Sequence, residues 1–236
     1  MIGGDRTDGP FEYERTETRL TMSRRGTRWL SNGINGGYVN ADSAHNLTVE
    51  DGFGRTDLRV YAAERLGGKP NGPTLLTGVY QEHARGARKG PIEVVATAGV
   101  SNPATLPVPG NPEGRPINPK GKRGIGTVNI FVGTTQPLSD SGLAGLLATV
   151  VEAKTATLLE LADCTGTTSD AVVVGCDPAD ERSSFAGSAT EIGNAARICV
   201  RDAVQAALDS RYETMPTPET AEYGVETNGV ATVFDP

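Results

Sequence analysis

The alternation of apolar and polar positions along the chain predicts short strands in its first half. Apolar segments at residues 19–22, 28–30 and 44–49 are separated by Asn32-Gly33 and Asn35-Gly36-Gly37, which are strong turn formers. We expect these three strands to form a β-meander. Further apolar segments predict strands at 75–80, 92–97, 127–132 and 171–174.

Three other segments place apolar residues at the spacing of a helix. Residues 56–66 end at Gly67-Gly68, and residues 139–161 form the longest predicted helix. A third helix is predicted at 188–208, where Ser188 and Glu191 have the spacing of a capping box. The pattern therefore predicts an α+β fold in which mixed β-sheets are layered with the two long helices of the C-terminal half, with an α/β sandwich as the alternative.

The length and composition favour one domain. A chain of 236 residues with 37% hydrophobic content buries one core more readily than two. Few apolar side chains or periodic patterns occur near the ends, so we predict a flexible N-terminal extension over 1–17, a single domain over 18–212 and a flexible C-terminal tail over 213–236. The Pro-rich segment 103–119 is expected to be a lid, a binding loop or a disordered insertion.

The charge balance excludes several partners. The net charge is −7, and no run of Lys or Arg alternates with aromatic residues, so we expect no nucleic-acid binding. Lys occurs only at positions 69, 89, 120, 122 and 154, and this preference for Arg in an acidic chain is typical of a salty, archaeal-like cytoplasm. No apolar run approaches 18 residues and no signal peptide is evident, which predicts a cytoplasmic protein that does not bind membranes.

Cysteine and histidine content narrows the chemistry further. Three cysteines without Cys-x-x-Cys spacing predict neither a zinc ribbon nor a disulfide framework, and two histidines are too few for a His-rich metal site. Cys164 has no neighbouring cation or histidine in sequence to favour a thiolate, and Cys199 has the position of a core residue. Phosphate-binding, dinucleotide-binding and Gly-x-Ser-x-Gly motifs are missing. We expect no metal and no cofactor.

One charged residue interrupts the apolar stripe of the longest helix. The stripe contains Leu143, Leu147, Val150, Leu158 and Leu161, and Lys154 lies in its middle. A lysine in this position must be paired, extend to the surface or be a partly desolvated amine. Glu152 points to the opposite side of the helix, so a direct ion pair between the two is excluded on a regular helix.

Polar residues gather where predicted elements end. The segment 165–170 connects the longest helix to a strand, and the segment 97–103 ends another strand in a glycine, a hydroxyl and an amide. Rigid elements can direct such groups at a ligand. Each segment is also an ordinary turn when taken alone, and His45 also fits a structural role.

Taken together, these segments resemble the adenosylcobinamide amidohydrolase family. The resemblance covers about residues 20–208, with Thr168-Ser169 and the Pro-rich segment as departures from the family pattern. It is carried by seven motifs in the same order: Leu30-Ser31 with Asn35-Gly36-Gly37, His45-Asn46, Thr97-Ala98-Gly99 with Ser101-Asn102, Gly126-Thr127-Val128-Asn129, Glu152-Ala153-Lys154, Thr165-Gly166-Thr167 with Asp170, and Ala186-Gly187 with Gly193.

The resemblance implies hydrolysis of the amide that joins the propionyl arm of the corrin ring to aminopropanol, with the corrinoid as substrate. Our mechanistic hypothesis makes Glu152 or Asp170 the general base. Lys154 or the backbone N–H groups near Thr167 and Ser101 would stabilise the oxyanion. The expected substrate-binding residues are Asn35, Gly36, Gly37, His45, Asn46, Thr97, Ser101, Asn102, Asn129, Thr165 and Thr167.

Two alternatives stay open at this point. The chain could bind or carry a corrinoid without cleaving it, or it could be an amidase that acts on another substrate through a nucleophile such as Thr167. The oligomeric state is also open, and a homo-oligomer is compatible with the sequence.

Overall fold

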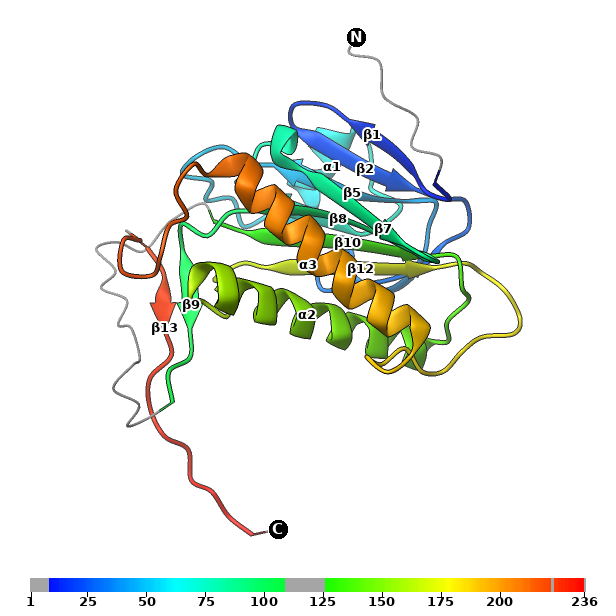
Figure 1. Ribbon diagram of the computed structural model, residues 1–236. Helices are drawn as coiled ribbons and strands as arrows, with labels where there is room; N and C mark the ends of the chain where they lie inside the picture. Colours follow the sequence, from blue (N-terminus) through cyan, green and yellow to red (C-terminus); the bar gives the residue numbers. More distant parts are fainter. Residues whose placement is uncertain (1–8, 109–125, 222, 236) are drawn as a thin grey trace.

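The computed structural model describes residues 9–108, 126–221 and 223–235. Figure 1 shows two β-sheets stacked on one another, with two long helices on the outer side of the larger sheet. The small sheet has the strand order β1 (Glu12–Arg15), β2 (Arg19–Ser23), β5 (Ser43–Thr48) and β6 (Thr74–Thr77). The large sheet has the order β4 (Gly37–Asn40), β3 (Arg28–Ser31), β12 (Ala171–Cys176), β10 (Val128–Thr134), β8 (Ile92–Ala98) and β7 (Arg85–Lys89).

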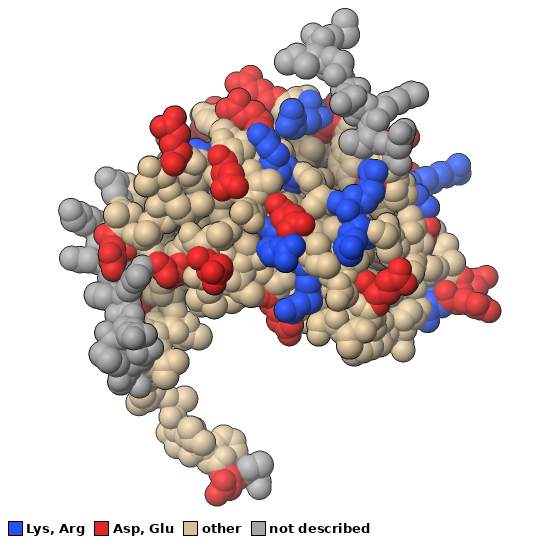
Figure 2. Space-filling model, viewed as in Figure 1, with Lys and Arg blue, Asp and Glu red and all other residues tan. Residues whose placement is uncertain are grey.

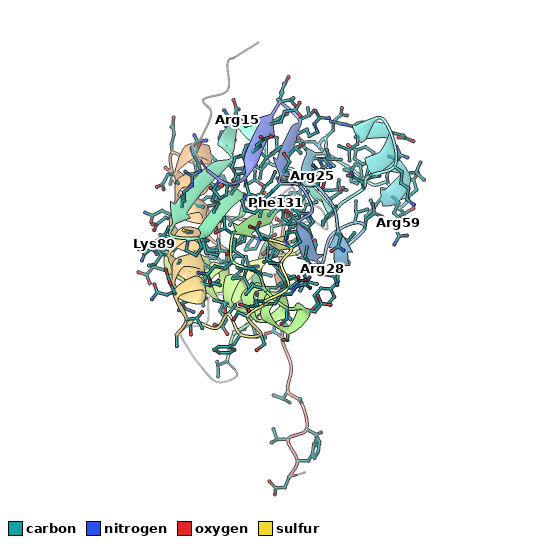
Figure 3. The ribbon with its side chains drawn as sticks, turned by 90° about the vertical axis from the view of Figure 1, so that its right-hand side faces the viewer. Arg15, Arg25, Arg28, Arg59, Lys89 and Phe131 are labelled. Carbon is teal, nitrogen blue, oxygen red and sulfur yellow. The ribbon has the colours of Figure 1, made fainter. Side chains whose placement is uncertain are left out.

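Alternating side chains of the large sheet form two separate cores. Ile130 and Val132 pack with the helices, whereas Phe131 between them packs with Met22 and Trp29 toward the small sheet. Figure 3 shows Phe131 in the middle of the molecule, with Lys89 and Arg59 at opposite edges. Because both faces of β10 are covered, all of its residues are buried. The predicted α+β fold with layered mixed sheets and two long helices is confirmed.

The two long helices lie where the apolar spacing predicts them. The first, α2 (Asp140–Ala162), is capped by Ser139, whose side chain accepts a hydrogen bond from Gly142 N at 3.2 Å. The second, α3 (Glu191–Arg211), begins after Thr190, whose hydroxyl accepts from Gly193 N at 3.0 Å. The predicted capping box at Ser188 is therefore wrong, because the chain enters the helix only two residues later.

The predicted β-meander is also wrong. Strands β2 and β3 belong to different sheets, since β2 pairs with β1 and β5 whereas β3 pairs with β4 and β12. The chain passes from one layer to the other between Arg24 and Thr27, so that Met22 and Trp29 meet in the same core. The predicted helix at 56–66 is present as α1 (Leu58–Leu66), which connects the parallel strands β5 and β6.

Ordered elements extend into the segments predicted to be flexible. Strand β1 lies within 1–17, and Phe11 before it is 1% exposed. Near the other end, β13 (Val225–Glu226) pairs with β9 (Pro103–Thr105), which in turn pairs with β11 (Gly166–Thr167). Residues 1–8 and most of the Pro-rich segment lie outside the described residues.

Charge and hydropathy can be followed over the described part of the chain. Figure 2 shows Lys and Arg interspersed with Asp and Glu on the face that carries α3. Within the described ranges, α2 is the one helix long and apolar enough to span a membrane, and half of that apolar segment is buried inside the fold. This is weak evidence for a membrane span, because core helices of soluble proteins meet the same criterion.

Candidate active site

A cleft of about 1860 Å³ opens where β10 and β12 begin. Its walls come from the β3–β4 turn, from residues 49–60 between β5 and the first turn of α1, from β6, and from the turns that precede β10 and β12. The cleft is larger than the roughly 300–1,000 Å³ of most small-molecule pockets. Five predicted site residues line it: Asn35, Gly36, Gly37, Ser101 and Asn102.

The β3–β4 turn lines the cleft with backbone atoms of glycine residues. Asn35 and Gly37 have φ angles of 53° and 79°, in the left-handed region that asparagine and glycine tolerate best. A Cβ atom on Gly36 would lie 2.4 Å from the carbonyl oxygen of Ser31, so a side chain has no room there. The Asn-Gly-Gly sequence is therefore required by the shape of this wall.

A second wall is built around Asn102, which is 3% exposed. Its Nδ2 donates to Thr168 Oγ1 at 2.6 Å, which links the 99–102 turn to the loop before β12. Its Oδ1 is buried and has no hydrogen-bond partner among the described residues. Gly126 packs against the same turn, where a Cβ atom would lie 2.0 Å from Oδ1. The wall thus contains a buried amide acceptor that nothing in the described fold satisfies.

Lys154 and Asp170 form a buried ion pair beneath the loop that carries Thr168 and Ser169. Their side chains are 9% and 10% exposed, and Lys154 Nζ donates to Asp170 Oδ2. The carboxylate also accepts from Val128 N at 2.9 Å, from Thr167 N at 3.0 Å and from the Thr167 hydroxyl. With four donors around it, Asp170 holds the loop to β10. Neither member of the pair lines the cleft.

Three further predicted residues form a buried chain of hydrogen bonds between the sheets. Asn129 Nδ2 donates to Asn46 Oδ1 at 2.8 Å and to the Leu76 carbonyl at 2.9 Å, and Asn46 Nδ2 donates to Thr97 Oγ1 at 3.0 Å. All three are at most 1% exposed. They lie behind the cleft wall formed by Leu76, so the structure brings them together as a support for that wall.

The structure places three predicted residues away from the cleft. Glu152 lies on the exposed side of α2, 3.4 Å from Arg197 of α3. Thr165 is bonded to the carbonyl of Ala104 at 2.9 Å. His45 bonds Thr21 Oγ1 and Ser43 Oγ on the side of the small sheet that faces away from the large sheet, and burial, aided by Arg19, lowers its pKa to about 4.

The cysteines have no thiolate character. All three are free and buried, and burial raises the pKa of Cys164 to about 11, with a smaller contribution from the charge of Asp170. Over the described ranges of the chain, no group of three His, Cys, Asp or Glu side chains could hold a metal ion.

Several residues that line the cleft were not predicted from the sequence. Arg211 comes from the last turn of α3, Tyr223 comes from the C-terminal tail, and Glu50 and Asp51 lie in the loop after β5. A basic residue in the last turn of a helix is common, so the position of Arg211 in the sequence does not predict that it lies at the cleft. Only the packing of α3 beside the 99–102 turn brings it to the cleft.

Comparisons with known proteins agree on one family. The family model for adenosylcobinamide amidohydrolase matches residues 6–216. A curated adenosylcobinamide amidohydrolase of Halobacterium salinarum is 46% identical over 232 residues, which cover 96% of this chain and 100% of the relative. A protein of the same name from Methanosarcina mazei is 28% identical over 197 residues, which cover 78% of this chain and 91% of the relative. The chain belongs to the adenosylcobinamide amidohydrolase family.

Proposed function

We propose that the chain hydrolyses adenosylcobinamide to adenosylcobyric acid and aminopropanol, as a step in corrinoid salvage. The observation that carries this proposal is the family match over residues 6–216, which includes both stacked sheets, the three helices and all of the cleft residues except Tyr223 and Gly224. The cytoplasm is the location we propose, and three free, buried thiols are compatible with its reducing conditions.

The cleft has the size and chemistry that this substrate requires. A corrin ring is a large macrocycle with neutral amide groups at its rim, and a volume of about 1860 Å³ exceeds an ordinary ligand pocket. Neutral donors and acceptors such as Asn35, Ser101 and Asn102 can bind amides without burying an unpaired charge. The size of the cleft and these neutral lining residues support a corrinoid as the ligand.

Hydrolysis also needs a base to activate water. Asp57 in the cleft is paired with Arg55, whereas the side chains of Glu50 and Asp51 make no hydrogen bond to another described residue. We therefore assign the role of general base to Glu50 or Asp51. Glu152 and Asp170 are not assigned this role, because both lie outside the cleft and are paired with other residues. Lys154 and Asp170 position the loop that carries Thr168 and Ser169.

Incubation of the purified chain with adenosylcobinamide, with and without a chelator, tests the proposal. We expect aminopropanol and adenosylcobyric acid to appear in equal amounts by mass spectrometry. Glu50→Gln and Asp51→Asn identify the base, since one of them should abolish turnover in a folded protein. Full turnover in both variants would show that neither Glu50 nor Asp51 is the general base.

The two rival functions give different outcomes in the same experiment. A carrier protein would bind the corrinoid and return it intact, so binding without release of aminopropanol would contradict hydrolysis. A covalent route through Thr167 would leave an adduct of the corrinoid acyl group on that residue. The Thr167 hydroxyl donates to Asp170 and does not line the cleft, which favours direct attack by water.

A further inference from the structure

Arg211 carries a guanidinium group with no partner at the wall of the cleft. Its Nε is buried and unpartnered, and its side chain makes neither a hydrogen bond nor an ion pair with any other residue that the structure describes. The guanidinium lies over the ring of Tyr212, 5.4 Å from the ring centroid. A half-buried guanidinium has five N–H donors, and it is unusual for none of them to bond to an acceptor in the protein. Hydration that is lost on burial is normally replaced by hydrogen bonds.

The surrounding contacts fix the position of this group. Tyr212 accepts a hydrogen bond from Val100 N at 3.1 Å, which holds the end of α3 against the 99–102 turn. Gly99 provides the space, since a Cβ atom there would lie 3.3 Å from Arg211 Nε. Asn102 belongs to the same turn, and its buried Oδ1 also has no partner among the described residues. Two residues that line the same cleft around one turn therefore each keep one buried, unsatisfied atom, a donor in Arg211 and an acceptor in Asn102.

These two groups are complementary to an amide. We propose that Arg211 and Asn102 form the subsite that binds the scissile amide: the guanidinium donates to the carbonyl oxygen, and Asn102 Oδ1 accepts the amide N–H. Because Asn102 Nδ2 is engaged by Thr168, its oxygen is held as the acceptor. The inference rests on the proposed hydrolysis and adds a catalytic residue, Arg211, that the sequence motifs do not contain.

The role of Arg211 follows from the charge that develops during the reaction. The oxygen of water bonds to the carbonyl carbon while its proton passes to the base, and the carbonyl oxygen becomes an oxyanion beside the guanidinium. The carbonyl then re-forms as the C–N bond breaks, the leaving nitrogen takes the proton from the base and departs as an amine, and the new carboxylic acid loses its remaining proton to solvent. The product is a carboxylate, which a guanidinium can bind through two parallel hydrogen bonds. The Arg211 contact thus strengthens from substrate to transition state and product.

Kinetics and product binding of Arg211→Gln test the subsite. We expect kcat to fall about 100- to 1,000-fold, which is the usual effect of removing one oxyanion donor, with little change in KM. The dissociation constant for adenosylcobyric acid, measured by equilibrium dialysis from corrin absorbance, should rise about tenfold or more, since a charge-assisted pair is lost. Arg201→Gln on the exposed side of α3 is the matched control and should change neither value.

Arg211→Lys keeps the charge but not the planar fork, so it should retain more product affinity than Arg211→Gln while kcat stays reduced. Unchanged kcat and product affinity in a folded Arg211→Gln protein would overturn the proposal, as would a rise in KM alone. If Arg211→Gln does not fold, Arg211→Lys decides by the same two measurements. Product binding tests the Arg211 subsite separately from the proposed hydrolysis. If adenosylcobyric acid binds tightly and this binding depends on Arg211, the subsite is supported even if the chain does not release aminopropanol.

Discussion

Some buried polar side chains near the cleft support its walls, whereas two residues that line it keep an unsatisfied atom. Asp170 accepts four hydrogen bonds and does not line the cleft. Asn102 and Arg211 line it and keep an unsatisfied atom. Unsatisfied buried groups cost free energy unless a ligand completes them, so at the residue scale they are the better guide to the reacting atoms.

Replacing Lys154 with Met should destabilise the fold. The change keeps the volume but leaves the buried carboxylate of Asp170 without its cation, at a cost of about 3 kcal/mol. Urea unfolding should show this loss, and the double change Lys154→Met with Asp170→Asn should recover part of it. Turnover should fall because the Thr168–Ser169 loop shifts, so undiminished turnover in the folded variant would show that Lys154 plays no part in the site.

The fold should lose stability in acid because of His45. The folded state lowers the pKa of this ring from 6.5 to about 4, so the unfolded chain binds more protons between these values. Stability is fully present above pH 6.5 and falls as the pH decreases toward 4. His45→Gln should flatten this part of the profile in urea midpoints measured across the window. An identical slope in the variant would assign the acid sensitivity to other groups.

At the scale of elements, the cleft depends on turns that only small residues can form. Gly36 and Gly126 both lie where a Cβ atom would meet backbone or the Asn102 amide within 3 Å. Helix ends matter in the same way, since α3 carries Arg211 in its last turn and starts at a defined cap. The boundaries of these elements therefore determine which side chains reach the substrate.

The start of α3 can be tested with two similar changes. Thr190→Ala removes the hydroxyl that accepts from Gly193 N and should lower the free energy of unfolding by about 1 kcal/mol. Ser188→Ala removes a hydroxyl from the position of the predicted capping box and should have little effect. Equal losses in the two variants, measured by urea unfolding, would contradict the cap at Thr190.

At the scale of the whole molecule, three layers converge on one edge. The small sheet supplies β6, the large sheet supplies the starts of β10 and β12, and the helical layer supplies the end of α3. The C-terminal tail reaches the same edge, where β13 pairs with β9 and Tyr223 lines the cleft (Figure 1). The site therefore forms only when the whole domain is assembled, and no single sequence motif contains it.

Ending the chain after Thr220 should leave a folded domain with weaker substrate binding. The change removes β13 and the cleft residues Tyr223 and Gly224 but none of the main core. We expect KM for adenosylcobinamide to rise several-fold, since Tyr223 and Gly224 line the cleft. A smaller fall in kcat should accompany it, because Gly224 packs against Pro103, the residue after Asn102. Circular dichroism and steady-state kinetics measure both effects. Unchanged KM would show that the tail makes no productive contact with the substrate.

The sequence by itself determined the three helices, the positions of the strands β2, β3, β5, β6, β8, β10 and β12, the layered α+β class, the family and the composition of several cleft walls. Apolar periodicity and glycine-rich turns are local properties, so Gly36, Asn102 and the bounds of α2 could be recognised without coordinates. Strand pairing was not predictable in the same way. The assignment of β2 and β3 to different sheets, and the outward face of His45, depend on partners distant in sequence. Tertiary structure alone brought Arg211 to Asn102, because the direction of a side chain into a cleft is set by how α3 packs on the 99–102 turn.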